Sequence, residues 1–462
     1  MANKLTAPSD PALAPGEARC PGPSFQDIIN ADQDQVPDAL RVQQFEFIGD
    51  EDIPFDRYIS DDFAQSETNH MWNRVWQWAC REEHIPGPGD RYVYDICDWS
   101  ILVVRGEDEN IRAFINSCPH RGMQFADTGS TGVRRKTIRC PFHGMAFNLD
   151  GSLNEIPCRW DFPHLDENNF RLTEIQCDIW GGFVFINMDP DVAPLADYLE
   201  VIPDHFKLWS MDDRHVALHT EKILPANWKM AMEAFLEAFH VLETHSQAVL
   251  TAADANAQYD IFGKNVSRFM HAIGVPSPHV QRDVDPQEIF GKLGRDPGTL
   301  PAGASARAAH AQLLREEYSE KFGVDLSGKS TSEMLDSIEY FLFPNAFFFP
   351  GINIRLCYRF RPIDVDHCLH EILVLQPVPE GEPHPAPARP IRLGVDDSYT
   401  QIPDFALAEI LDQDTDNLKM QRTGAKASRK GAQSLGNYQE ARIRQMHLTL
   451  DEYLKSSDKA AS

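Results

Sequence analysis

Long hydrophobic runs are absent from this sequence, because no apolar stretch approaches the ~20 residues that a membrane-spanning helix needs. Residues 1–24 are polar and rich in Pro and Ala, and they lack the apolar core of a secretory signal peptide. Positive charge is also scarce, because 43 Lys and Arg face 70 Asp and Glu, giving a formal charge of −27. Nucleic-acid backbones and anionic membranes attract basic surfaces. We therefore expect a cytoplasmic protein that binds neither nucleic acid nor membranes.

Cysteine is sparse, with nine residues in a chain of 462. In a reducing compartment such residues are metal ligands or buried thiols rather than disulfides. The length allows about three domains of ~150 residues or two larger ones. The composition predicts three segments: a disordered or extended arm over residues 1–45, a β-rich domain with a helical lead-in over 46–195, and a larger mixed domain over 196–462.

Residues 85–190 contain short runs typical of β-strands, separated by turn signals such as Asp150-Gly151. Strands are predicted over residues 91–96, 100–104, 113–115, 137–139, 145–148 and 182–186. The spacing of apolar residues predicts helices over residues 60–81 and 228–243. A polar segment over 284–335 is expected to be an insertion in the second domain.

Two short motifs in the β-rich segment each combine one Cys with one His: Cys118-Pro-His120 and Cys140-Pro-Phe-His143, with 19 residues between them. Zinc fingers instead keep their two Cys together and their two His together. The pattern is typical of a two-iron, two-sulfide cluster in which both Cys bind one iron and both His bind the other. A zinc site or a coincidence of buried residues is the alternative interpretation.

In their fuller form, Cys118-Pro-His-Arg-Gly122 and Cys140-Pro-Phe-His-Gly-Met-Ala-Phe147, these motifs resemble the cluster loops of Rieske-type non-heme iron ring-hydroxylating oxygenases. The resemblance extends over about residues 45–455 and implies the alpha, or terminal oxygenase, subunit. It implies an α+β fold, with an N-terminal all-β Rieske [2Fe-2S] domain. The larger catalytic domain would have an antiparallel sheet covered by helices, of the helix-grip or START-like type. The cluster ligands would be Cys118, His120, Cys140 and His143.

His240 and His245 lie five residues apart in the second predicted helix. On a regular helix they would point ~140° apart, so they can share a metal only if the helix is irregular or ends between them. Taken alone, they could equally be two core or surface histidines. The run resembles the catalytic helix of the same family, and the resemblance implies that both bind a mononuclear Fe(II). It also places Glu237 at the acidic position, often Asp, that connects the two metal centres.

An Fe(II) site of this kind needs a carboxylate beside its two histidines. The family has an Asp seven residues before a Gln, and the resemblance therefore selects Asp414, which precedes Gln421 by that spacing. Asp412 and Asp416 are the competing candidates, and all three could be solvated carboxylates on a helix.

The resemblance implies a terminal oxygenase that receives electrons from NAD(P)H through a reductase, with or without a ferredoxin. It would use O2 to hydroxylate a hydrophobic, aromatic or polycyclic substrate, as in aromatic hydrocarbon catabolism. Dihydroxylation, monohydroxylation and demethylation share the same metal ligands. The resemblance also implies a homotrimer, with or without a small beta subunit, in which the cluster of one chain faces the iron of the next across Glu237.

Other interpretations remain open from the residues. A Rieske electron carrier without oxygenase activity and a zinc-dependent binding module are the competing classes. A di-iron bundle would need four helices around the pairs Glu237/His240 and Glu67/His70, and the β-rich segment between the pairs does not provide them. The Phe-rich stretch (Phe341, Phe343, Phe347, Phe348 and Phe349) could line a pocket or pack in a core strand. Arg355 or Arg359 could bind a substrate carboxylate or be ordinary surface charge.

Overall fold

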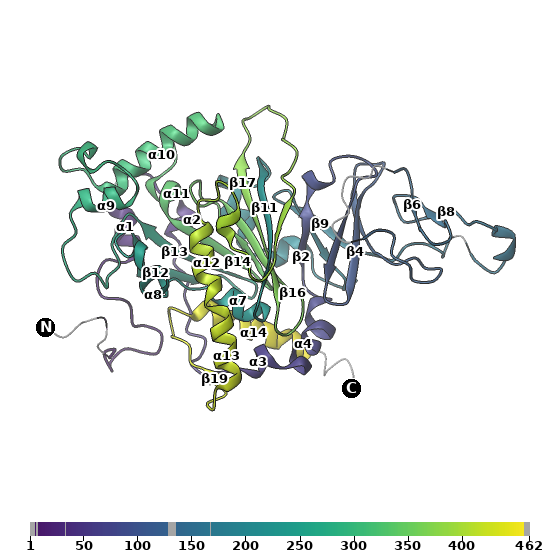
Figure 1. Cartoon of the computed structure of the whole chain (residues 1–462), viewed down its shortest axis with the longest axis horizontal. Coiled ribbons are helices and arrows are strands. Elements are labelled where there is room, and N and C mark those ends of the chain that lie inside the picture. The colour runs from purple at the N-terminus through teal and green to yellow at the C-terminus, as the bar shows by residue number, and fades with distance from the viewer. Residues whose placement is uncertain (1–4, 6–7, 33, 128–134, 167, 457–462) are drawn as a thin grey trace. The chain divides into compact units, whose positions relative to one another are not determined.

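The computed structural model describes residues 5, 8–32, 34–127, 135–166 and 168–456 (Figure 1). These residues form two compact units, which we describe separately. The smaller unit contains residues 65–198, with short pieces at 384–387 and from 453 onwards. The larger unit contains the described residues up to 64, together with 199–383 and 388–452.

The smaller unit is built on a six-stranded antiparallel sheet with the order β2-β10-β9-β5-β4-β3, and it carries a second sheet with the order β6-β7-β8. The strands are β2 (Gln77–Arg81), β3 (Arg91–Ile96), β4 (Trp99–Arg105), β5 (Ile111–Ile115), β6 (Ile138–Arg139), β7 (Ala146–Phe147), β8 (Leu153–Glu155), β9 (Glu174–Trp180) and β10 (Phe183–Asn187). Apolar side chains from both sheets, such as Phe114 and Phe147, pack in one core with Cys118 and Cys140.

The helix predicted over residues 60–81 is shorter than expected. α4 (Asp61–Glu67) continues into one π-helical turn over Thr68–Trp72, and the last five predicted residues form β2 instead. All five residues of β2 are buried and the strand pairs with β10. Burial in a sheet therefore outweighs the helical spacing of these apolar residues.

The larger unit is built on an eight-stranded sheet with the order β12-β13-β14-β15-β16-β17-β11-β18. Neighbouring strands are antiparallel except β11 and β18, which are parallel. The strands are β11 (Arg214–Leu224), β12 (Ala252–Ile261), β13 (Val266–Ile273), β14 (Ser337–Leu342), β15 (Ala346–Phe348), β16 (Leu356–Pro362), β17 (Cys368–Pro377) and β18 (Pro390–Leu393). Because side chains alternate between the two faces of a sheet, the register places Phe269, Glu339 and Tyr358 on one face.

Helices cover this face, as predicted for the catalytic domain, and the α+β fold class is confirmed. α7 contacts β16 and β17, and α14 forms an ion pair with Glu339 through Arg442. The larger unit also contains the helices α7 (Trp228–Glu233), α8 (Val241–Thr244), α9 (Pro286–Lys292), α10 (Ala306–Phe322), α11 (Thr331–Leu335), α12 (Ala408–Asp416), α13 (Leu418–Ala427) and most of α14 (Ala441–Ser456). Among the described residues, no helix combines the length and the apolar character that crossing a membrane requires.

The first part of the chain folds onto the larger unit, in contrast to the predicted disordered or extended arm. α1 (Phe25–Ala31) begins after Ser24, which exchanges hydrogen bonds with Asp27 in a capping box. α1 contacts β12 and β13, where Phe25 and Ile29 are buried. α2 (Asp38–Arg41) follows. Residues up to 64 thus group with the larger unit, whereas residues 1–4, 6–7 and 33 of the predicted arm lie outside the described residues.

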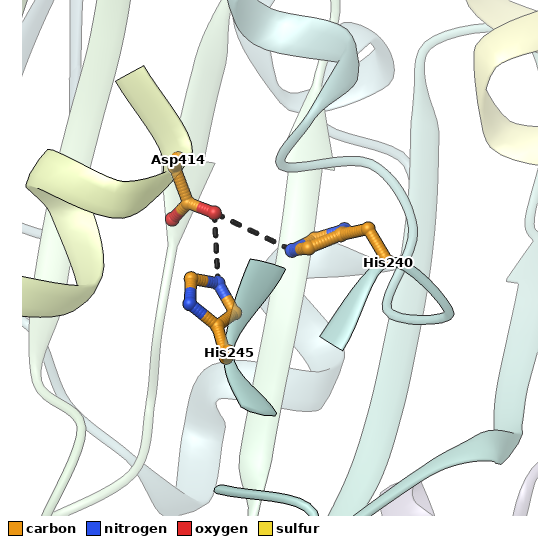
Figure 2. Close-up of side chains that lie close together, drawn as sticks. All are labelled: His240, His245 and Asp414. Atoms are coloured by element: carbon orange, nitrogen blue, oxygen red, sulfur yellow. Dashed lines mark hydrogen bonds and ion pairs between the residues drawn. The ribbon is translucent and has the colours of Figure 1, made fainter. Parts of the chain in front are cut away.

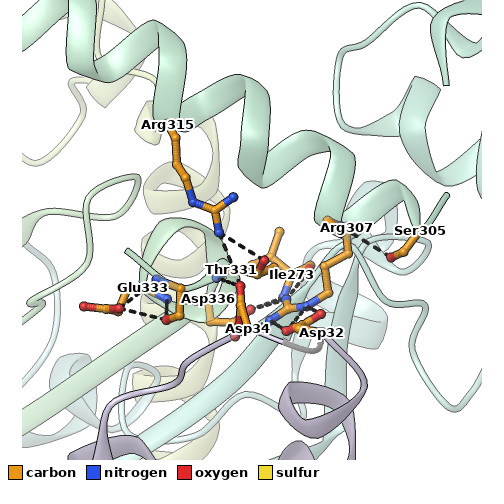
Figure 3. Close-up of polar contacts among 11 residues, drawn as sticks. Asp32, Asp34, Ile273, Ser305, Arg307, Arg315, Thr331, Glu333 and Asp336 are labelled. Carbon is orange, nitrogen blue, oxygen red and sulfur yellow. Dashed lines mark hydrogen bonds and ion pairs between the residues drawn. The ribbon is translucent and has the colours of Figure 1, made fainter. Parts of the chain in front are cut away.

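A buried ion-pair network joins the N-terminal segment to α10 and to the central sheet (Figure 3). Arg307 on α10 donates to Asp32 at 2.9 Å and to Asp336 at 2.7 Å, and none of the three side chains is more than 5% exposed. Asp336 also accepts a hydrogen bond from the backbone N–H of Ile273 at 2.9 Å. The network therefore holds the end of β13 beside the start of β14.

Replacing Arg307 with Met should strongly destabilise the larger unit, because Asp32 and Asp336 would remain buried without a cation. Breaking a buried pair costs about 3–5 kcal/mol, to be measured as the loss in free energy of unfolding in urea. The matched control is Arg282→Met, which removes an exposed pair with Glu288 and should cost less than ~1 kcal/mol. Equal losses in the two variants would contradict the role assigned to Arg307.

Candidate metal centres

The two Cys–His motifs of the smaller unit form loops with the same backbone hydrogen bonds. The N–H of Cys118 donates to the carbonyl of Met123 at 2.9 Å, and the N–H of Gly122 donates back to the carbonyl of Cys118 at 2.8 Å. In the second loop, Cys140 pairs in the same way with Met145 and Gly144, at 2.8 and 3.1 Å. Gly122 and Gly144 have φ of +75° and +78°, a conformation that residues with a Cβ rarely adopt. The sequence therefore builds two equivalent tight loops.

The loops bring their four candidate ligands together in an asymmetric arrangement. The Cys118 and Cys140 side chains are buried in the core, whereas His120 is half-buried and His143 is exposed. The two imidazole rings lie 4.7 Å apart between centroids. Burial, together with the neighbouring Cys140 thiol, raises the pKa of Cys118 to about 11, so a cation would be needed to stabilise the Cys118 thiolate. Two buried sulfurs and two outward imidazoles fit the ligand set of a Rieske cluster.

In the larger unit, His240, His245 and Asp414 converge on one point (Figure 2). Asp414 Oδ1 lies 2.8 Å from Nε2 of His245 and 3.4 Å from Nε2 of His240. A metal ion ~2.1 Å from each ligand atom requires ligand atoms that are roughly 3 Å apart. The three side chains therefore fit one mononuclear metal site with two His and one carboxylate.

The helix predicted over residues 228–243 is interrupted, and the interruption brings the two histidines together. α7 ends at Glu233, and irregular backbone follows before the single turn of α8. His240 and His245 flank that turn, at its N-cap and its C-cap, and His245 has non-helical dihedral angles (φ −119°, ψ 51°). The prediction of one helix over residues 228–243 was wrong, and the condition that the helix be irregular, or end between the two histidines, is met.

Each histidine is oriented by a second polar contact on its other ring nitrogen. Nδ1 of His240 lies 2.6 Å from Oε1 of Glu237, and Nδ1 of His245 lies 2.7 Å from Oε1 of Gln413. Contacts of this kind fix which nitrogen faces the metal. Sequence reasoning identified Glu237 but missed Gln413, although Gln413 directly precedes Asp414 in the sequence.

The electrostatics of this site favour a bound cation. Burial opposes charge on His240, but the carboxylates of Glu237 and Asp414 outweigh it and raise the pKa of His240 to about 10. Burial likewise opposes charge on Asp414, yet hydrogen bonds from both histidines lower its pKa. Two carboxylates thus face two imidazoles in a buried site, and a divalent cation would balance them.

The competing acidic residues are engaged elsewhere. Asp412 pairs with Lys222 at 3.2 Å and accepts the N–H of Tyr399, whereas Asp416 is exposed. Among the described residues, a second group with metal-binding geometry consists of His219, Glu221 and Glu371. Its central carboxylate, Glu371, already lies 2.6 Å from Arg359 and 3.3 Å from Arg361, so cationic side chains occupy the place of a metal.

The three candidate ligands, His240, His245 and Asp414, line a cavity of about 220 Å³ in the larger unit. Its walls are mostly apolar and include Phe269, Phe349, Ile354, Leu356 and Leu411. The polar groups that line it away from the metal-binding residues are His271, Ser337, Glu339 and the phenol of Tyr358.

The residues of the Phe-rich stretch and the two arginines, Arg355 and Arg359, occupy different positions relative to the cavity. Phe349 lines the cavity, whereas the rings of Phe341 and Phe347 pack against each other at 5.2 Å. Phe343 and Phe348 are buried outside the cavity lining. Arg359 pairs with Glu371, and Arg355 lies over the ring of Phe322 at 4.9 Å, so both arginines lie outside the cavity wall.

Comparison with protein families matches residues 75–166 to the Rieske [2Fe-2S] domain and residues 204–456 to the ring hydroxylating alpha subunit (catalytic domain). The chain belongs to the ring-hydroxylating alpha subunit family. The two domains of this alpha subunit imply a Rieske [2Fe-2S] cluster and a mononuclear iron as cofactors.

Among curated relatives, the benzene 1,2-dioxygenase alpha subunit of Pseudomonas putida is 30% identical over 327 residues, which are 67% of this chain and 68% of that protein. The carnitine monooxygenase oxygenase subunit of Escherichia coli (strain K12) is 30% identical over 201 residues, 42% of this chain. The matched region spans about half, 52%, of that relative's length.

Solved structures share the fold of this alpha subunit. A quaternary ammonium Rieske monooxygenase in complex with L-carnitine has a TM-score of 0.62 at 18% identity, over 87% of this chain and 95% of that chain. Naphthalene 1,2-dioxygenase with bound indole has a TM-score of 0.60 at 16% identity, over 88% of this chain and 93% of that chain.

Replacing Asp414 with Ala should remove the mononuclear iron and leave the cluster intact, because the two sites use different residues. Iron should fall from about three to about two atoms per chain, while acid-labile sulfide stays at about two. Elemental analysis of the reconstituted protein measures both quantities. Asp416→Ala is the control and should keep all the iron, because Asp416 is exposed. Iron loss in the control but not in Asp414→Ala would contradict the assignment.

Proposed function

We propose that this alpha subunit is the terminal oxygenase of a Rieske system that hydroxylates an apolar small molecule with O2. One observation carries the proposal: two imidazoles and a carboxylate converge, each supported by its own contacts, at the wall of an apolar cavity. A cavity with convergent polar groups is the usual form of a substrate site. Family membership supports the reaction class, and the cavity walls support the apolar substrate.

In this proposal, Cys118, His120, Cys140 and His143 hold the cluster, and His240, His245 and Asp414 hold the iron. When bound, these groups supply electrons one at a time and activate O2. Glu237 and Gln413 hold the two imidazoles in the orientation that directs Nε2 toward the metal position. The apolar walls exclude water from the substrate. The cavity leaves room for the substrate beside His240 and His245.

Membership of the family supports a proposal for the electron donors and the assembly. We propose that electrons come from NAD(P)H through a reductase, with or without a ferredoxin. We also propose a trimer, with or without a beta subunit, in which Glu237 contacts a cluster histidine of the next chain. Glu237 is suited to this role because it also lines a polar hollow with Glu233, Gln433 and Glu440. The electron-carrier alternative is disfavoured, because a carrier has no use for a second metal site beside a cavity.

Turnover with isotopically labelled O2 tests the oxygenase proposal. The complete alpha subunit, loaded with cluster and iron, is supplied with a surrogate reductase and a panel of apolar aromatic compounds. Label is expected in a hydroxylated product, with one or two labelled atoms separating monohydroxylation from dihydroxylation. A protein that accepts electrons and binds the compounds but yields only reduced oxygen species would contradict the proposal.

Glu237→Ala tests the connection between the centres. Both metal centres should remain, since Glu237 is a ligand of neither, but single-turnover electron transfer should slow about 10- to 100-fold, as for other partners of metal ligands. Stopped-flow absorbance of the cluster measures the rate. Glu243→Ala, in an exposed position on α8, is the control and should transfer electrons at the original rate. An unchanged rate in Glu237→Ala would refute the role.

A further inference from the structure

Among the described residues, two polar side chains on the sheet side of the cavity have no hydrogen-bond partner. His271 is on β13 and Ser337 is on β14, and the two residues are directly opposite each other in the antiparallel register. Opposed residues on one face have Cβ atoms ~4.5–5.5 Å apart, so both side chains can reach one ligand atom. Within the described part of the chain, neither ring nitrogen of His271 and no atom of the Ser337 hydroxyl group takes part in a hydrogen bond, and Nδ1 of His271 is buried.

Three other histidines in the larger unit each have a partner on one ring nitrogen, although Nε2 of His370 and Nδ1 of His447 are also buried without one. His370 bonds Tyr399 at 2.8 Å, His205 bonds Tyr340 at 2.8 Å, and His447 lies 2.7 Å from Glu233. Leaving a buried polar group unpaired costs about as much free energy as a lost hydrogen bond. A ligand with a complementary polar atom would recover that cost.

Neighbouring residues hold the ring of His271 in place, but none of the described residues forms a hydrogen bond with it. Phe269 stacks on it, with centroids 5.7 Å apart and an interplanar angle of 21°. The Arg307 network fixes the strand ends beside it, because Asp336 precedes Ser337 and binds the N–H of Ile273. The two polar groups are therefore presented to the cavity by rigid strands, as a binding site requires.

The charges around the cavity restrict the ligand further. Glu339 is the carboxylate on this wall, and Arg442 at 2.8 Å and the Tyr358 hydroxyl at 2.7 Å already engage it. It therefore offers little attraction to a quaternary ammonium group. Burial lowers the pKa of His271 to about 4, so its ring is neutral near pH 7 and offers no positive charge to a substrate carboxylate. The cavity is thus suited to an uncharged ligand.

We propose that His271 and Ser337 together bind a hydroxyl or carbonyl oxygen of an uncharged, otherwise apolar substrate. The neutral imidazole has one donor and one acceptor nitrogen, and the serine hydroxyl can donate and accept, so the pair can satisfy either kind of oxygen. The natural substrate is then an oxygenated apolar compound, rather than a bare hydrocarbon or a quaternary ammonium ion. The inference deepens the proposed function by naming the substrate class of the same cavity, and it depends on that function only for the chemistry that follows binding.

Binding of matched probes to the complete, metal-loaded protein tests this assignment. Isothermal titration calorimetry without O2 or reductant compares indane, 1-indanone, 1-indanol and benzyltrimethylammonium. The ketone and the alcohol should bind about tenfold more tightly than indane, the effect of one well-placed hydrogen bond, and the cation should bind most weakly. Because no turnover is involved, the result is independent of whether the protein proves to be an oxygenase.

Variants then assign the preference to the two side chains. His271→Phe and Ser337→Ala should bring the ketone-to-indane affinity ratio close to 1 while leaving the affinity for indane within about twofold. His271→Gln should retain a preference, because its amide also donates and accepts hydrogen bonds. His367→Phe, at a half-exposed position outside the cavity, is the control and should behave as the original protein.

Three outcomes would overturn the proposal. The first is equal affinity of the original protein for indane and its ketone, or no binding of any probe. The second is tighter binding of the ammonium probe than of the ketone. The third is a preference that survives in both His271→Phe and Ser337→Ala.

Discussion

The convergence of two imidazoles on one carboxylate oxygen is the constraint on which the rest of the larger unit depends. Asp414 is buried and negatively charged, and such a group is stable in the interior only when cationic partners or hydrogen-bond donors surround it. His240 and His245 supply these contacts, and Glu237 and Gln413 in turn orient the histidines. The interrupted backbone after α7 follows from the same requirement, since a continuous helix would direct the two imidazoles apart.

Different structural elements of the larger unit supply the candidate metal ligands and the walls of the cavity. Irregular segments and the helix α12 carry the candidate metal ligands. The sheet supplies the apolar wall, with two polar groups that have no hydrogen-bond partner among the described residues. A rigid sheet can position a ligand precisely because each strand is fixed by its neighbours. The curved segment around α8 can instead adopt the backbone angles that a metal site demands.

Features that short motifs form could be predicted from the sequence. Features that depend on which residues of two strands face each other could not. The Cys–His loops could be predicted because each contains its own turn. Asp414 was selected through the resemblance to the family, whose spacing between an Asp and a Gln it matches with Gln421. The break after Glu233 could not be predicted, because residues 228–243 have helical propensity and only tertiary contacts end the helix. Residues 77–81 form a strand for the same reason. His271 and Ser337 are 66 residues apart (337 − 271), and only the pairing of β13 with β14 makes them neighbours.

The Arg307 network has a consequence for how the chain folds during synthesis. Asp32 and Arg307 are separated by 275 residues, and at ~5–20 residues per second a ribosome adds that length in tens of seconds. Asp32 lacks its ion-pair partner throughout that interval, and α1 lacks the strands β12 and β13, on which it packs, for most of it. The beginning of the chain must therefore remain without these contacts until synthesis has reached α10.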